Sequence, residues 1–196
     1  MLDIFEILGP IMVGPSSSHT AGAVRIGRMA RTLLGVPPVK ADIGVYGSFA
    51  ETGRGHGTDR ALVAGLLGMK PDDLRIPHSF EIAGEQELDF QVHSVELREA
   101  HPNTAVLTVE GASGRKTCVQ AASTGGGRIR VDQLDGVAVS FTGIFNTLIL
   151  RHWDVPGELA HLTKELSDGG INIANMSLMR DRRGGSVMTI FEIDQP

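Results

Sequence analysis

Cysteine is almost absent from this sequence: Cys118 is the only one among 196 residues. A single thiol cannot close a disulfide within the chain, and it cannot by itself hold a zinc or iron–sulfur site, which takes about three or four ligands. Any such metal centre must draw most of its ligands from another chain. Cys118 itself lies in a β-like stretch and is interpreted as a small buried hydrophobic residue.

Basic runs and long apolar runs are also missing. Lys and Arg total 18 against 23 Asp and Glu, the formal net charge is −5, and the basic residues are scattered. The chain therefore lacks the electrostatic footprint of a nucleic-acid-binding protein. No apolar stretch approaches the roughly 20 residues of a membrane span. The apolar opening segment, residues 1–8, carries acids where a secretory signal carries lysines. We expect a cytoplasmic protein that binds neither nucleic acid nor membranes.

Aromatic residues are scarce at 5%, whereas glycine is abundant at 25 residues. Several glycines cluster in short runs, at residues 53–57 and 125–127. Such clusters favour turns and binding loops built from backbone over a helical bundle. At roughly one domain per 150 residues, the length allows one large domain or two small ones.

The hydrophobic pattern predicts an α+β fold for the first domain, residues 1–140. A proline-free helix is expected over residues 21–34, and one of its faces carries mostly small residues suited to close packing. These are Ala23, Gly27, Ala30 and Leu34.

In the rest of this domain a second loop followed by a helix is expected, and the sequence then becomes β-rich. An alternating strand is expected over residues 39–45. Residues 53–57 are expected to form a glycine loop before a helix that ends near Leu67, with Thr58 and Asp59 as capping candidates. Residues 79–139 are expected to form short β pieces separated by turns.

A second, smaller domain is expected over residues 144–196. Residues 147–152 read as a strand, and a helix begins at Pro156. Two further strands follow over residues 171–179 and 186–193, which gives the order β-α-β-β.

Ser16, Ser17, Ser18, His19 and Thr20 form the sharpest local motif. Three consecutive hydroxyls and an imidazole precede a helix whose first N–H groups lack intrahelical partners, an arrangement that suits an anion such as a carboxylate. The imidazole exchanges protons near neutral pH. On local chemistry alone, the simpler interpretation is a serine cap followed by solvated turn residues.

Three other segments have both a functional and a plain interpretation. Residues 53–57 could form a nest of backbone N–H groups or a flexible connection with a capped helix. Residues 101–104, His-Pro-Asn-Thr, could bind a ligand or serve only as a turn. The glycines at residues 125–127 favour close approach of a backbone or ligand, although no ligand identity follows from them.

Four ordered segments together resemble the β subunit of iron–sulfur-dependent L-serine dehydratases: GPSSSHTAGAVRIGRMA, GRGHGTDRALVAGLLG, HPNT and STGGGRI. Their order and number carry the resemblance, which covers essentially residues 1–140. This part also resembles the allosteric substrate-binding domain of some phosphoglycerate dehydrogenases. Residues 144–196 resemble a ferredoxin-like ACT domain that is incomplete, because a second helix and a fourth strand are missing.

The resemblance implies a catalytic role shared with a second chain. In that family the active site lies between this subunit and an α subunit whose cysteines hold a 4Fe-4S cluster. The iron would act as Lewis acid on the hydroxyl of L-serine while an α proton is removed, and the product aminoacrylate would become pyruvate and ammonia. His19 would transfer the proton, and the hydroxyls of Ser16, Ser17, Ser18 and Thr20 would bind the carboxylate. No residue of this chain is expected to ligate a metal.

The resemblance also implies regulation and self-association. His101 and Asn103 would contact L-serine as an effector, and Asp154 and Gly157 would form the effector position of the ACT-like segment. A truncated or pairing ACT segment would favour a homodimer of this chain. Two alternatives remain: a purely regulatory amino-acid-sensing module without catalytic residues, and an assembly subunit that only stabilises its partner.

Overall fold

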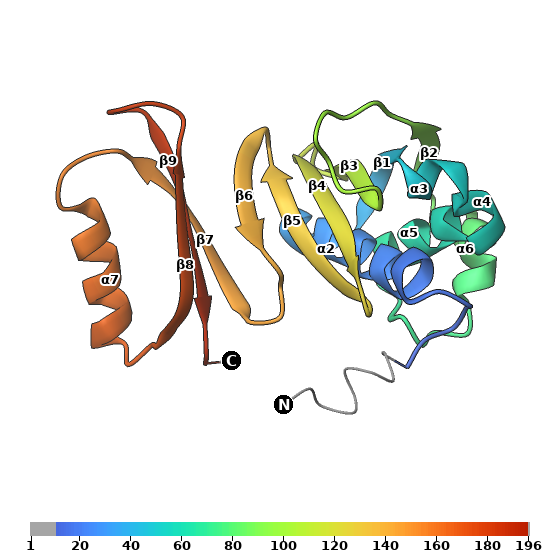
Figure 1. Cartoon of the computed structure of the whole chain (residues 1–196), viewed down its shortest axis with the longest axis horizontal. Helices are drawn as coiled ribbons and strands as arrows, with labels where there is room; N and C mark the ends of the chain where they lie inside the picture. Colours follow the sequence, from blue (N-terminus) through green and yellow to red (C-terminus); the bar gives the residue numbers. More distant parts are fainter. Residues whose placement is uncertain (1–10, 196) are drawn as a thin grey trace. The chain divides into compact units, whose positions relative to one another are not determined.

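The computed structural model describes residues 11–195. The described residues divide into two compact units, one that ends at Asp135 and one that begins at Gly136 (Figure 1). The apolar opening segment, residues 1–8, lies outside the described residues. No helix among the described residues is both long and apolar enough to cross a membrane.

A mixed β-sheet forms the central layer of the first unit. Its strands are β1 (Pro38–Tyr46), β2 (Asp89–Ser94), β3 (Thr104–Gly111), β4 (Lys116–Gly125) and β5 (Arg128–Leu134), in the order β2-β1-β3-β4-β5. β1 runs parallel to β2, and the pairs β1–β3, β3–β4 and β4–β5 are antiparallel. Along β1 the buried side chains of Ala41, Ile43 and Val45 share one face, because successive side chains of a strand alternate in direction.

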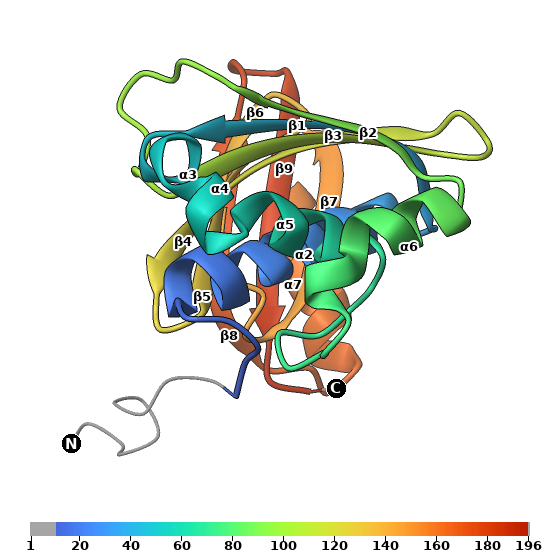
Figure 2. The same cartoon turned by 90° about the vertical axis from the view of Figure 1, so that its right-hand side faces the viewer.

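Helices cover one face of this sheet (Figure 2). They are the π-helical turn η1 (Ser17–Gly22), α2 (Ala23–Leu34), α3 (Ser48–Glu51), α4 (Gly53–His56), α5 (Thr58–Leu66), the 3-10 turn η2 (Ile76–His78) and α6 (Ser79–Glu85). η1 runs directly into α2, so the predicted helix is confirmed and begins earlier than expected. Together the helices and the sheet confirm the α+β class.

Two glycines let α2 and α5 touch backbone to backbone. A β-carbon on Gly27 would overlap the carbonyl oxygen of Leu62, and one on Gly65 would overlap that of Val24. The other members of the predicted small-residue stripe are fully buried: Ala23, Ala30 and Leu34. The close packing expected from this stripe is confirmed.

Residues 53–57 were predicted as a loop, and this prediction is wrong. α4 fills most of the segment, and Gly57 ends it with φ of 68°. Thr58 does not cap α5, because the N-cap position falls on Gly57 and the buried Thr58 hydroxyl has no hydrogen-bond partner within residues 11–195. The side chain of Asp59 accepts the adjacent N–H of Arg60 at 2.8 Å and no helix N–H further along α5. Thr58 is the first residue of α5 rather than the residue before it, and its buried hydroxyl accepts none of the free N–H groups of the first turn.

Two further expectations need correction. Residues 79–85, expected to be β-rich, form α6, which packs against α5 through buried Ala83 and the hydrogen bond from Ser79 Oγ to the carbonyl of Arg60 at 2.8 Å. Tertiary packing decides such short segments. Cys118 is half-buried rather than buried, on the sheet face away from the helices.

The second unit contains β6 (Val137–Phe141), β7 (Asn146–Trp153), α7 (Glu158–Asp168), β8 (Ile173–Arg180) and β9 (Ser186–Ile193). β7 and β8 lie on either side of β9 and are antiparallel to it. The predicted order β-α-β-β is confirmed. β9 is buried at its centre, with Ile190 and Phe191 almost fully enclosed.

Candidate active site

Four segments meet at one end of the first unit's sheet, and each contains or adjoins a motif that was singled out in the sequence. Residues 16–20 lead into α2, and residues 47–57, of which only 53–57 were singled out, follow β1. Residues 101–103 precede β3, and residues 123–127 lie where β4 turns into β5. Because neighbouring antiparallel strands begin and end at the same edge, the chain order and the sheet order together bring these segments together.

Direct contacts link these segments. The carbonyl of Asn103 accepts the N–H of Ser123 at 2.9 Å, and the carbonyl of Pro102 lies against Gly47, where a β-carbon would approach it to 2.6 Å. Gly22 packs so closely on Ser123 that a β-carbon there would overlap its hydroxyl. The glycines in and beside these motifs thus permit close packing of loops.

His19 lies at the meeting point of η1 and α3. Ser16 is the N-cap of η1, and its Oγ accepts the backbone N–H of His19 at 3.1 Å and lies 3.4 Å from the ring Nδ1. On the opposite edge of the ring, Nε2 is 3.1 Å from both Ser48 Oγ and Thr52 Oγ1. Both ring nitrogens are therefore surrounded by hydroxyl groups.

The surroundings of His19 favour its neutral form. Partial burial is the largest cause that lowers the pKa of His19 below its ordinary 6.5, and the positive charge of nearby His56 adds to it. A hydrogen bond with the backbone of Ser48 opposes the shift. Phe49 packs edge-on against the ring at 5.3 Å between centroids, and His56 does so at 5.0 Å. At neutral pH the imidazole is thus ready to accept a proton.

Sequence reasoning missed Ser48 and Thr52. Ser48 is the first residue of α3 and Thr52 is its C-cap, four residues later, so both hydroxyls lie on one side of this helical turn and meet the same ring nitrogen. A hydroxyl pair at this spacing directly after β1 is the signal that was available. This spacing does not identify the partner of the two hydroxyls. The partner is His19, which lies 29 residues before Ser48 and 33 residues before Thr52.

The other three residues of the serine-rich motif differ in how far they are exposed to solvent. Ser17 and Ser18 are half-buried in η1. Thr20 is 3% exposed, packs against Gly14, and its hydroxyl has no hydrogen-bond partner within the described chain. The structure therefore brings Ser16 and His19 together, leaves Ser17 and Ser18 beside them, and encloses Thr20.

His101 and Asn103 organise the turn before β3. The N–H of Asn103 donates to His101 Nδ1 at 3.1 Å, and the Thr104 hydroxyl donates to the carbonyl of His101 at 2.7 Å. Both residues are half-buried. The turn is thus held by its own side chains, and it supports Ser123 through the Asn103 carbonyl.

Asp154 and Gly157 lie in the second unit, between β7 and α7. Asp154 Oδ2 accepts the Gly184 N–H at 2.9 Å and the Arg180 guanidinium at 3.1 Å. The Gly184 hydrogen bond, with help from Arg180, lowers the pKa of the Asp154 carboxyl. Gly157 is the N-cap of α7 with φ of 90°. Asp154 therefore ties the turn before α7 to the turn between β8 and β9.

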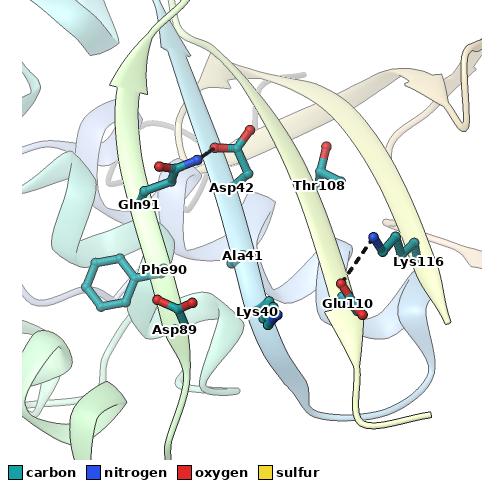
Figure 3. A pocket seen from close by; sticks show the side chains of 9 residues that line it. All are labelled: Lys40, Ala41, Asp42, Asp89, Phe90, Gln91, Thr108, Glu110 and Lys116. Atoms are coloured by element: carbon teal, nitrogen blue, oxygen red, sulfur yellow. Dashed lines mark hydrogen bonds and ion pairs between the residues drawn. The ribbon is translucent and has the colours of Figure 1, made fainter. Parts of the chain in front are cut away.

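A hollow of about 360 Å3 lies on the face of the first unit's sheet that carries Lys40 and Asp42 (Figure 3). Among its lining residues, Lys116 lies 3.3 Å from Glu110, and Gln91 donates to Asp42 at 2.7 Å. His19 and the serine-rich motif are not among its lining residues. Within residues 11–195 no group of three or more His, Cys, Asp or Glu side chains is arranged to hold a metal ion.

Comparison with known proteins gives a consistent picture. Residues 1–85 match the family described as serine dehydratase beta chain. The chain is 38% identical over 192 residues to a probable L-serine dehydratase, beta chain, of Bacillus subtilis, covering 98% of this chain and 87% of the relative. It is 37% identical over 193 residues to the L-serine dehydratase, beta chain, of Peptoniphilus asaccharolyticus, with the same coverage.

An L-serine dehydratase of Streptomyces coelicolor is 28% identical over an alignment of 206 positions, which covers 92% of this chain and 44% of that longer protein. These findings define a subunit of a serine dehydratase. The chain belongs to the serine dehydratase beta chain family.

Proposed function

We propose that this chain is the β subunit of an L-serine dehydratase, which converts L-serine to pyruvate and ammonia together with an α subunit. The observation that carries the proposal is the His19 imidazole, held neutral among hydroxyls where four loops meet. The names of the relatives supply the substrate.

The reaction needs a base and a carboxylate-binding surface. The Cα–H and Cβ–O bonds of serine break, a C=C bond forms and water leaves; the aminoacrylate then tautomerises to an imine and hydrolyses. Neutral His19 accepts the α proton. Ser17 and Ser18 donate hydrogen bonds to the carboxylate, and Ser16 turns its single hydroxyl proton from His19 Nδ1 to the carboxylate when serine binds, which leaves Nδ1 open to the α proton. We assign enclosed Thr20 to support of η1 rather than to contact with substrate.

A 4Fe-4S cluster, if it is the cofactor, belongs to the α subunit. Such clusters are held by cysteine thiolates, and Cys118 is the single cysteine of this chain. It lies half-buried in β4, and the residues of this chain do not fit the cluster. We propose that this chain contributes the base and the carboxylate site to an interface with the cluster-bearing subunit.

Reconstitution tests this division of labour. The chain and its cluster-loaded α subunit are prepared anaerobically, and pyruvate formation from L-serine is measured for each alone and for the mixture. We expect turnover only in the mixture. Full turnover by the α subunit alone would contradict the proposal and favour a regulatory or assembly role for this chain.

We also propose that the chain senses L-serine as an effector. In the first unit, His101 and Asn103 would contact it, since the half-buried His101 Nδ1 already accepts a hydrogen bond and leaves its Nε2 for a ligand. In the second unit, Asp154 and Gly157 would form the effector position of an ACT-like domain. The support is topological: β7 and β8 run parallel with β9 between them and α7 as the crossover, a split β-α-β arrangement.

Finally, we propose that two copies of this chain associate through the edge strand β8. An unpaired strand edge is a template for pairing, and β8 exposes Met176 and Leu178, which are 42% and 38% exposed. Sedimentation velocity of the chain checks this. A dimer is expected, and Leu178→Glu should shift it toward monomer; a monomeric parent chain would refute the proposal.

A further inference from the structure

We propose that Ser48 and Thr52 hold His19 in the tautomer that carries its proton on Nε2, which makes Nδ1 the proton-accepting atom. The inference rests on the proposed function of His19 and deepens it. It adds two positioning residues, Ser48 at the start of α3 and Thr52 at its C-cap. Neither the sequence motifs nor the relatives' names mark this element.

The argument begins with the single proton of the Thr52 hydroxyl. Thr52 Oγ1 donates to the carbonyl of Ser48 at 2.9 Å, one helical turn earlier. A hydroxyl has one proton to give, so toward His19 Nε2, at 3.1 Å, Thr52 Oγ1 acts as an acceptor. The neutral ring satisfies this contact only with its hydrogen on Nε2.

Ser48 is compatible with the same tautomer. Its Oγ lies 3.1 Å from Nε2 and 3.5 Å from Thr52 Oγ1. It can therefore share the Nε2–H as a second acceptor while its own proton turns toward Thr52. The two hydroxyls form a fork that accepts one N–H, and the reverse tautomer would place the Nε2 lone pair against the Thr52 oxygen.

The other edge of the ring has the opposite arrangement. Ser16 Oγ accepts the backbone N–H of His19, so its proton remains free, and Nδ1 lies 3.4 Å away. Ser16 can thus donate to an unprotonated Nδ1. The basic lone pair of His19 therefore faces the serine-rich motif, on the side where we place the substrate carboxylate, while α3 holds the back of the ring.

Fixing the tautomer matters because a free imidazole exchanges its proton between two nitrogens. When only one nitrogen faces the substrate, a ring that spends time in the wrong tautomer is inactive for that fraction. Edge-on packing by Phe49, with centroids 5.3 Å apart, further restricts rotation of the ring. Ser48 and Thr52 thus act through His19 and touch no substrate themselves.

Nitrogen NMR tests the tautomer directly and needs no partner subunit. In the full chain labelled with 15N-histidine, at a pH above the pKa of His19, Nε2 is expected to show the shift of a protonated nitrogen and Nδ1 that of an unprotonated one. Combining Thr52→Val with Ser48→Ala should move both shifts toward an average of the two tautomers, and Thr52→Ser should keep the parent pattern. A parent chain with the proton on Nδ1 overturns the inference.

Turnover of the reconstituted complex gives an independent readout. The double variant is expected to lose roughly 10- to 100-fold in kcat, by analogy with the groups that orient metal-binding histidines. KM should change little, and the variant that keeps the hydroxyl, Thr52→Ser, should retain most of the parent kcat. Unchanged kcat would refute the positioning role. Circular dichroism checks folding, and if the double variant does not fold, the tautomer of the parent chain decides. The two proposals fail in different experiments. An active His19→Ala variant would refute the catalytic role of His19 and leave the NMR result on its tautomer unaffected.

Discussion

His19 depends on its neighbours for its affinity for protons, and His56 is the neighbour that can be changed without touching the hydroxyl shell. Its positive charge helps to lower the pKa of His19. His56→Gln should therefore raise the pKa of His19 toward 6.5, its ordinary value. Because the neutral ring is the active form, the acidic limb of the kcat profile should move to higher pH. NMR titration of the His19 ring protons measures the shift.

His78→Gln is the matched control, since His78 is an exposed histidine in the same unit. It should leave the titration of His19 where it is. A titration of His19 that is the same with and without His56 would show that this charge does not reach the ring.

The lowered pKa also makes stability depend on pH. Near pH 6.5 the unfolded chain binds more protons at residue 19 than the folded chain does, so the free energy of unfolding falls as pH decreases from about 6.5 toward the folded-state pKa. His56→Gln should reduce this loss. Urea unfolding at several pH values measures the free energy of unfolding for the parent chain and the variant. The same pH dependence in both would count against an electrostatic coupling between His56 and His19.

Of the residues around the His19 ring, the sequence predicted those of the serine-rich motif and missed those that follow β1. The serine-rich motif was found because hydroxyls and an imidazole are adjacent in the chain. Ser48 and Thr52 were not found, because their link to His19 arises only when β1 carries the chain across the sheet to α3. Contacts between distant segments leave no local pattern in a single sequence.

Among the elements, the pair α2 and α5 depends on two glycines that let the helix backbones touch. Gly27→Ala places a methyl group onto the carbonyl of Leu62, which cannot turn aside. We expect the helices to be forced apart at a cost of about 3 kcal/mol in the free energy of unfolding, the upper range for overpacked cores. Chemical denaturation measures this cost.

Gly84→Ala provides the comparison. Gly84 lies inside α6, and a β-carbon there would meet nothing within 4 Å. Alanine should stabilise this helix by about 0.5–1 kcal/mol. Equal effects of the two substitutions would mean that helix propensity, and not the close contact, governs Gly27.

Element prediction succeeded where periodicity was strong. The small-residue stripe of α2 and the alternation along β1 were both found in the structure, and so was the β-α-β-β order. It failed at α4 and α6, which are only four and seven residues long. Short helices carry little periodic signal, and packing against α5 fixes them, so composition suggested loop and strand instead.

For the whole molecule, the proposed regulatory site can be separated from the proposed catalytic site. His101→Ala in the reconstituted complex is expected to leave kcat close to the parent value and to change the dependence of rate on serine concentration. The reason is that His101 orders the turn before β3 through Asn103 and Thr104, and within residues 11–195 it forms no hydrogen bond with His19. A rate curve that matches the parent at every serine concentration would contradict the effector role.

The central claim is that this chain supplies the base of the reaction. The most direct test is kcat of the anaerobically reconstituted complex with His19→Ala, after assembly with the α subunit has been verified by size. The account predicts a fall of roughly 100- to 10,000-fold, the contribution of a positioned general base. Near-normal turnover by the assembled His19→Ala complex would contradict it.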